Sequence, residues 1–268
     1  MRRLSTIASL LVVVAFTALA PARADIVAAE LRNVEAAPAP NAALPLDLGF
    51  IDQSGRALTL RAAIAGLPSV LIFADYTCRT LCGPILEFAM AGLAKSGLKP
   101  AVDYRLVVIG IDPKDKPEAA QAMRTAHIDS GSEIGRASVF LTGDEAAIRA
   151  VTQAAGLRYT YDAKHDQYAH PAAIYVIDAK GTVRRVLSPL GLDGVDLRLA
   201  IVDAGRGSVG TLVDRIHLLC YGYDPAKGIY TERITSMLAF AAGLTLVVLF
   251  GGISLMALRE RRSNRLNT

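Results

Sequence analysis

Hydrophobic residues along the chain fall into short continuous runs that alternate with segments of helical spacing. The runs at 69–74 and 104–111 are each followed by an aspartate, and runs of this length are typical of strands buried on both faces of a parallel sheet. Helical spacing follows at 84–93, and again at 117–127, where a proline occupies the first turn. The first half of the pattern therefore predicts two strand–helix units.

The alternation continues and ends in an antiparallel pair. The remaining predicted elements are a strand at 138–141, helices at 144–155 and 195–204, and hairpins at 49–60 and 172–187. Strands that alternate with helices, followed by a late hairpin, indicate a partly parallel α/β sheet. We expect one compact domain over residues 47–207.

Both ends of the chain are more hydrophobic than a soluble domain requires. At the start, Arg2 and Arg3 precede an apolar run at 7–20 and a small-residue site at Ala22-Arg23-Ala24, which is the pattern of a signal peptide over residues 1–24. The alternative is an uncleaved anchor helix, and in both cases the chain that follows is exported. Residues 25–46 are rich in Ala and Pro, which predicts an extended, poorly ordered linker.

Residues 234–258 form an uncharged run of 25 residues, and ~20 apolar residues are enough to cross a bilayer. Four arginines in the tail at 259–268 follow directly, so the positive-inside rule places the C-terminus in the cytoplasm. A buried helix of a soluble core is the alternative. We expect a single-pass protein of the inner membrane whose domain faces the exported (periplasmic) side, joined to the helix by a juxtamembrane segment at 208–233.

The net charge of +4 also belongs to the ends. Three arginines before residue 25, and four arginines with one glutamate after residue 258, leave 22 basic and 24 acidic residues in between. A nucleic-acid-binding domain carries its basic surplus in the folded body, so this class of function is disfavoured.

Two of the three cysteines, Cys78 and Cys82, follow the first buried strand and begin the first long helix. If this turn is helical, their sulfurs share one face, and the N-terminus of a helix lowers the pKa of a thiol. Such a pair is able to bind a soft metal or to form a disulfide. A structural disulfide is the alternative in an exported protein. A disulfide that closes so short a loop, however, removes little chain entropy and stabilises the fold only weakly.

A cysteine pair at the start of the helix after a central strand is the thioredoxin arrangement, so we expect a thioredoxin-like sheet with flanking helices. In such a sheet the loop before the strand at 172–177 lies beside the cysteines, and that loop contains His170. His165 is the competing third ligand, whereas His127 is expected to interact with the C-terminus of its own helix. Two sulfurs and one imidazole suit copper, Cu(I) or Cu(II), and zinc is the second choice because a fourth ligand is missing.

Several motifs together resemble the Sco/SenC family over about residues 45–205. They are Asp75-Tyr76-Thr77-Cys78-Arg79-Thr80-Leu81-Cys82-Gly83-Pro84, Val108-Ile109-Gly110-Ile111-Asp112-Pro113, Phe140-Leu141-Thr142-Gly143, Tyr168-Ala169-His170, and Tyr175-Val176-Ile177-Asp178-Ala179-Lys180-Gly181. The resemblance implies a thioredoxin-like, membrane-tethered copper protein with Cys78, Cys82 and His170 as metal ligands. This chain departs from the family pattern at Gly83, where proline is usual, at Arg79, where many members have an acidic residue nearby, and in its C-terminal anchor.

The resemblance also implies the function. Family members deliver copper to the CuA centre of cytochrome c oxidase, so we expect a metallochaperone whose partner is the CuA-bearing subunit or another copper chaperone. The alternative is a thiol–disulfide oxidoreductase that uses Cys78 and Cys82 to keep the CuA cysteines reduced. Cys220, three residues after His217, is either an accessory ligand, a redox partner of the pair, or a packed cysteine.

Overall fold

The fold is seen in a computed structural model of the chain, which describes residues 34–78, 82–163, 165–190, 192–205, 221–224, 229–232, 244, 245 and 248. The expected signal peptide, Arg79, His217 and Cys220 lie outside the described residues, as does nearly all of the expected membrane segment. Within the described part of the chain, no helix is both long enough and apolar enough to cross a membrane.

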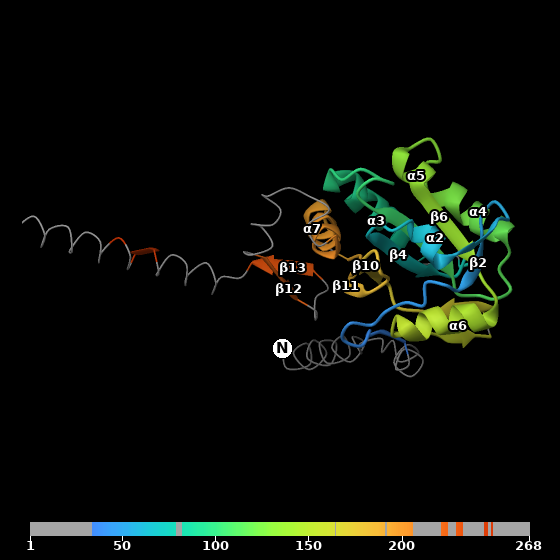
Figure 1. Cartoon of the computed structure of the whole chain (residues 1–268). Helices are drawn as coiled ribbons and strands as arrows, with labels where there is room; N and C mark the ends of the chain where they lie inside the picture. The colour runs from blue at the N-terminus through green and yellow to red at the C-terminus, as the bar shows by residue number, and fades with distance from the viewer. Residues whose placement is uncertain are drawn as a thin grey trace, which may run out of the picture.

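A seven-stranded sheet forms the centre of the domain (Figure 1). Its strands, in spatial order, are β11 (Val183–Leu187), β10 (Ile174–Ile177), β4 (Ser69–Ala74), β5 (Arg105–Gly110), β6 (Ser138–Thr142), β2 (Gly49–Asp52) and β3 (Ala57–Thr59). The three central strands, β4, β5 and β6, are parallel, and the two flanking pairs are antiparallel. The predicted partly parallel α/β sheet and both predicted hairpins are therefore confirmed.

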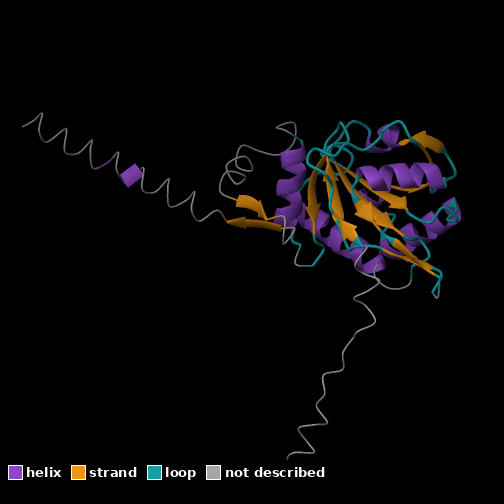
Figure 2. Ribbon diagram, turned by 90° about the horizontal axis from the view of Figure 1, so that it is seen from below, coloured by secondary structure: helices purple, strands orange, loops and turns teal. Residues whose placement is uncertain are grey.

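Helices cover both faces of this sheet (Figure 2). The helices are α2 (Leu60–Ile64), α3 (Cys82–Ser96), α4 (Pro117–His127), α5 (Glu133–Ala137), α6 (Glu145–Ala154) and α7 (Gly194–Ala204). All six side chains of β4 are buried, and alternate ones belong to opposite cores: Val70 and Ile72 pack with α3, α4 and α7, whereas Leu71 and Phe73 pack with α2 and α6. The two-sided burial explains why β4 is an uninterrupted apolar run.

The predicted helices are confirmed, and their starts follow from capping. Asp144 accepts from the backbone N–H of Ala147 at the start of α6, and Asp193 forms a capping box with Asp196 at the start of α7. The five-residue helices α2 and α5 were not predicted, because elements this short carry too few residues to show a periodicity.

The described part of the expected linker differs from the prediction. Strand β1 (Glu35–Ala36) pairs with β7 (Leu157–Arg158), and Ala43 bridges to Thr182. Leu44 and Leu46 are buried in the core with α2 and α6. The segment has low sequence complexity but supplies two leucines that close the core, so residues 34–46 belong to the folded domain.

Two small hairpins lie outside the main sheet. β8 (Thr160–Asp162) pairs with β9 (Gln167–Ala169) directly before His170. β12 (Tyr221–Asp224) pairs with β13 (Ile229–Glu232) within the expected juxtamembrane segment. The first of these hairpins leads the chain to the predicted metal ligand.

Candidate metal centre

The register of the sheet brings the cysteine segment and His170 together. Strand β10 runs antiparallel to β4, with Ile174 opposite Ile72. The residues that follow β4 therefore lie beside the residues that precede β10. This placement confirms that the loop entering the strand packs beside the cysteine loop.

All three predicted ligands meet at this point. The Sγ atom of Cys82 lies 3.1 Å from the Nε2 atom of His170, although the two residues are 88 positions apart. Cys82 also shares a side-chain hydrogen bond with Cys78. Both cysteines are thiols rather than halves of a disulfide, and Cys82 is buried whereas Cys78 is half-buried. Cys82 begins α3 and Cys78 precedes it, so the two sulfurs come together at the start of this helix.

His170 is oriented as a neutral ligand. Its Nδ1 atom lies 3.2 Å from the carbonyl oxygen of Pro171, and because a carbonyl only accepts, Nδ1 carries the proton and donates. The lone pair of Nε2 is thereby directed at Cys82. Burial lowers the pKa of His170, which favours the neutral imidazole that binds metals. A histidine held by a backbone carbonyl in this way is typical of metal sites.

The pKa of the Cys82 thiol is shifted in the opposite direction to the one that its position at the start of a helix predicts. We expect the helix N-terminus to lower its pKa, but the hydrogen bond with Cys78, then burial, then the negative charge of Cys78 raise the pKa of Cys82 far above the usual thiol range. The expectation was wrong because Cys82 is hydrogen-bonded to Cys78 and is the more buried of the two. Cys82 keeps its proton until a cation displaces it or an oxidant converts the two cysteines to a disulfide.

Tyr76 fixes the cysteine segment to the sheet. Its hydroxyl lies 3.0 Å from the carbonyl oxygen of Val108 and 2.9 Å from that of Leu141, which belong to β5 and β6. Burial raises the pKa of Tyr76 well above its usual value, so the hydroxyl remains a donor. The segment before Cys78 is thus tied to two strands besides its own.

Asp75 was not among the predicted site residues, yet it contacts both halves of the site. Its Oδ1 atom accepts from the backbone N–H and the hydroxyl of Thr77, at 2.9 and 2.8 Å. Its Oδ2 atom accepts from the backbone N–H of Tyr168 at 2.9 Å, two residues before His170. The sequence does contain one signal for it, an aspartate directly after a buried parallel strand.

A second carboxylate, Asp115, lies on the other side of Tyr76. Its Oδ2 atom accepts from the backbone N–H of Tyr76 at 3.1 Å. Burial, and then the charges of Asp75 and Asp112, raise the pKa of Asp115 to about 7. Asp112 is itself buried at the end of β5. The lone sequence signal for these groups is the Asp112-Pro113 turn, which does not show that three carboxylates converge.

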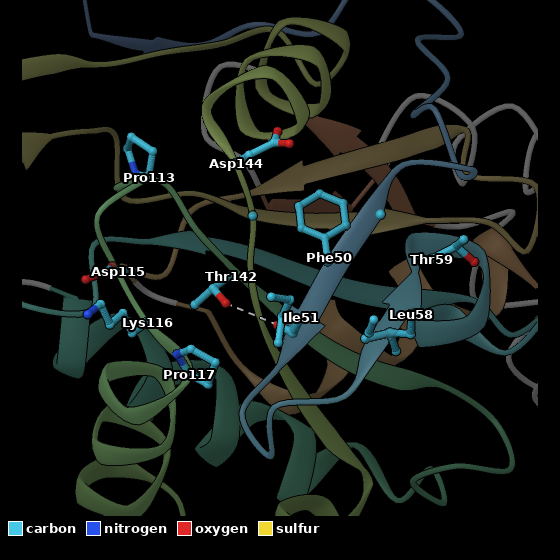
Figure 3. Close-up of a pocket in the computed structure, with 13 residues that line it drawn as sticks. Phe50, Ile51, Leu58, Thr59, Pro113, Asp115, Lys116, Pro117, Thr142 and Asp144 are labelled. Atoms are coloured by element: carbon cyan, nitrogen blue, oxygen red, sulfur yellow. Dashed lines mark hydrogen bonds between the residues drawn. The ribbon is translucent and has the colours of Figure 1, made fainter.

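Asp115 also lines a groove of roughly 700 Å3 between the β2–β3 hairpin and the loop that leads to α4 (Figure 3). Phe50, Ile51 and Leu58 form its apolar wall. None of the three predicted ligands lines this groove. The groove and the cysteine site are therefore neighbours that share the backbone contact between Asp115 and Tyr76.

The other described histidines are not at the site. His165 is 61% exposed in the turn of the β8–β9 hairpin, and its Nδ1 atom lies 2.5 Å from Asp162 Oδ2. His127 ends α4 as predicted, but its Nδ1 atom pairs with Glu87 of α3 at 3.0 Å, rather than with the C-terminus of α4 alone. The imidazole of His127 also lies against Gly83, where an added Cβ atom would overlap the ring.

The position of His127 explains one departure from the family pattern. Gly83 occupies the first turn of α3, directly after Cys82, and a larger residue there would displace the His127 ring. Arg79, the other departure, lies outside the described residues.

Soft sulfur and neutral imidazole donors fit copper better than magnesium or calcium. Among the residues that the structure describes, no three His, Cys, Asp or Glu side chains already surround a common point as metal ligands. Cys82 instead contacts each of the other two donors directly. The donors are adjacent and suited to a soft ion that enters between them.

Solved structures share this fold. A putative electron transfer protein from Aquifex aeolicus VF5 matches at 20% identity with a TM-score of 0.53, over 65% of this chain and 96% of that protein. A SCO1/SenC family lipoprotein from Bacillus anthracis str. Ames matches at 24% identity with a TM-score of 0.50, over 63% of this chain and 96% of that one. Arabidopsis thaliana ScoI, solved with copper bound, matches at 19% identity with a TM-score of 0.49, over 59% and 96%.

At identities below 25%, the first two likenesses show a common fold. No curated protein matches the chain. The family model described as SCO1/SenC matches residues 37–194, which is more than half of the chain and includes Cys78, Cys82 and His170. The thioredoxin-like fold, the meeting of the cysteine segment with His170, and this match lead to one conclusion: the chain belongs to the SCO1/SenC family.

Proposed function

We propose that this protein is a copper metallochaperone in which Cys78, Cys82 and His170 hold one copper ion. The observation that carries the proposal is the 3.1 Å approach of Cys82 Sγ to His170 Nε2, with Cys78 in contact with Cys82. Neither residue needs the other for packing alone, because a buried thiol and a buried imidazole are common as separate core residues. The contacts of buried Cys82 with both His170 and the half-buried Cys78 support a ligand set.

Copper is the cargo that these donors favour. Two sulfurs and one nitrogen suit Cu(I), and the same set suits a Cu(II) site with thiolate ligation. Zinc remains the second choice, since a structural zinc site requires a fourth protein ligand. Three ligands, one of them half-buried, leave a position at which an acceptor's thiolate is able to attack and take the ion by ligand exchange.

The acceptor in this proposal is the CuA-bearing subunit of cytochrome c oxidase, or another copper chaperone, as membership of the family suggests. The proposal places the domain on the exported side of the inner membrane. The uncharged run at 234–258 and the arginines after it support this topology.

The test is a competitive Cu(I) titration of the full chain, purified in detergent and reduced without oxygen. We expect one tightly bound equivalent. Cys78→Ser and Cys82→Ser are expected to weaken it by at least about 100-fold, and His170→Ala by about 10-fold or more, since removing a direct ligand costs at least as much as removing its supporting group.

His165→Ala is the matched control, because His165 is an exposed histidine in the turn of the hairpin that precedes His170. It is expected to bind copper as the wild type does. Absence of a tight site in the wild type, or equal affinity in all four variants, would contradict the proposal.

A thiol–disulfide oxidoreductase is the second candidate, and the contact between a half-buried and a buried thiol favours it. In that reaction Cys78 and Cys82 would form a disulfide and transfer two electrons and two protons to a disulfide of the acceptor, which becomes two thiols. His170 distinguishes the two functions: copper binding requires its Nε2 atom, whereas disulfide exchange proceeds in His170→Ala.

A further inference from the structure

Asp75 is the one fully buried carboxylate that joins the two ligand-bearing segments. Its side chain is 0% exposed. One oxygen holds Thr77, the residue before Cys78, and the other holds the backbone of Tyr168 in β9. Its own backbone N–H donates to the Cys82 sulfur. The hydrogen bonds of this single residue thus span the cysteine segment, the start of α3 and the strand that leads to His170.

Asp75 also differs from two other buried aspartates in its charge pairing. Asp52 pairs with Arg56 at 2.8 Å, and Asp178 pairs with Arg184 at 2.9 Å. Each of these turns has its negative charge matched by a guanidinium. Within the described part of the chain, Asp75 forms no ion pair, and all its contacts are hydrogen bonds from N–H and O–H groups. A buried carboxylate that has no cationic partner among the described residues is a favourable neighbour for a bound cation.

We propose that Asp75 is a positioning residue of the copper site, whose carboxylate fixes the distance between the cysteines and His170 and whose charge favours a bound cation. This inference rests on the proposed function and extends it to a residue outside the ligand set. Without the carboxylate, the β8–β9 hairpin keeps its own pairing but loses its link to the cysteine segment. His170 is then no longer held against Cys82.

The test compares Asp75→Asn with the wild-type full chain. Asparagine keeps the size of the side chain, removes its charge, and replaces one acceptor oxygen by an amide N–H2 that cannot accept from Tyr168 or Thr77. We expect Cu(I) affinity to fall by about tenfold or more, as it does when a supporting group of a metal ligand is lost. In the Cu(II)-loaded protein, electron paramagnetic resonance is expected to show weaker hyperfine coupling from the nitrogen of His170.

Asp178→Asn is the matched control. Asp178 is also a buried aspartate that accepts backbone N–H bonds in a turn, but its turn follows β10, at the end of that strand away from His170. This control is expected to lower thermal stability and leave copper affinity and hyperfine coupling unchanged. A purely structural role of Asp75 predicts the same result for both variants and would overturn the inference.

Different results would contradict the proposed function and this inference. If the wild type binds no copper tightly, the proposed function fails. If the wild type binds copper and Asp75→Asn binds it with equal affinity and coupling, the inference alone fails.

If Asp75→Asn does not fold, the Thr77→Val variant tests the inference instead, because it removes one hydrogen bond to Asp75 and keeps the carboxylate. A loss of about threefold in affinity supports the inference, since one modest hydrogen bond contributes about that much, and an unchanged affinity overturns it.

Discussion

At the scale of single residues, burial shifts the pKa of several groups at this site. His170 is kept neutral by burial, and Cys82 keeps its proton because it is buried beside Cys78. Asp115 shows the same effect on an acid, with a pKa raised to about 7. Burial therefore shifts the pKa of all three groups toward the form that carries no charge.

The raised pKa of Asp115 predicts a pH dependence of stability. Its ordinary pKa is 3.8 and its folded value is about 7, so between about pH 4 and pH 7 the folded protein binds the extra proton. The stability contributed by this group is therefore full below pH 4 and decreases as the pH rises to about 7. Asp115→Asn removes the decrease, and because the group is half-exposed we expect a gain of roughly 1–2 kcal/mol at pH 8.

The measurement is urea unfolding of both proteins at pH 4 and pH 8. The amide oxygen of asparagine still accepts from the Tyr76 N–H, so the local fold is retained. A free energy difference between variant and wild type that is the same at both pH values would contradict the assigned pKa.

At the scale of elements, the site is held by contacts between segments that are remote in the chain. Tyr76 ties the cysteine segment to β5 and β6, and Asp75 ties it to β9. The helix α3, which begins at Cys82, meets the end of α4 where the His127 ring covers Gly83. The first turn of α3 is thus shaped by a residue of another helix.

Replacement of Gly83 tests this contact between helices. Alanine at Gly83 would overlap the His127 ring, so Gly83→Ala is expected to destabilise the protein by about 1 kcal/mol as the ring moves and its pairing with Glu87 is lost. In a His127→Ala background the overlap is absent, and the higher helix propensity of alanine should make Gly83→Ala stabilising by up to about 1 kcal/mol. Thermal unfolding of the four proteins of this double-mutant cycle measures the sign change. Equal effects of Gly83→Ala in both backgrounds would exclude the contact as its cause.

At the scale of the whole molecule, the domain begins earlier than its low-complexity N-terminal segment suggests. Leu44 and Leu46 fill the core on the α2 and α6 face, and β1 closes against β7. The family match likewise begins at residue 37. The segment at 34–46 therefore contributes to folding as well as joining the domain to the preceding chain.

Truncation tests this contribution. A chain that begins at Asp47 loses both leucines and is expected to be at least about 3 kcal/mol less stable than a chain that begins at Val34, because burying one leucine in a core contributes about 2–5 kcal/mol. Urea unfolding of the two truncated chains gives the difference. Coincident unfolding midpoints would show that the segment adds nothing to the core.

The local sequence was sufficient to predict most elements and the donor types. The run at Ser69–Ala74 is apolar throughout because β4 is buried on both faces, and Pro117–His127 carries its helix signals within the helix itself. These are properties of neighbouring residues, so a pattern reveals them. The same local view predicted that Cys78, Cys82 and His170 belong together, through the order of strands and helices.

The tertiary structure alone decided what surrounds those donors. The contacts of Asp75 with Tyr168, of Asp115 with Tyr76, and of His127 with Gly83 join residues 93, 39 and 44 positions apart. The raised pKa of Cys82 is likewise the result of burial and of a neighbour's charge. Burial and hydrogen bonding between remote segments exist only once the sheet has aligned β4 with β10, and no periodicity in the chain encodes which polar group will then face which.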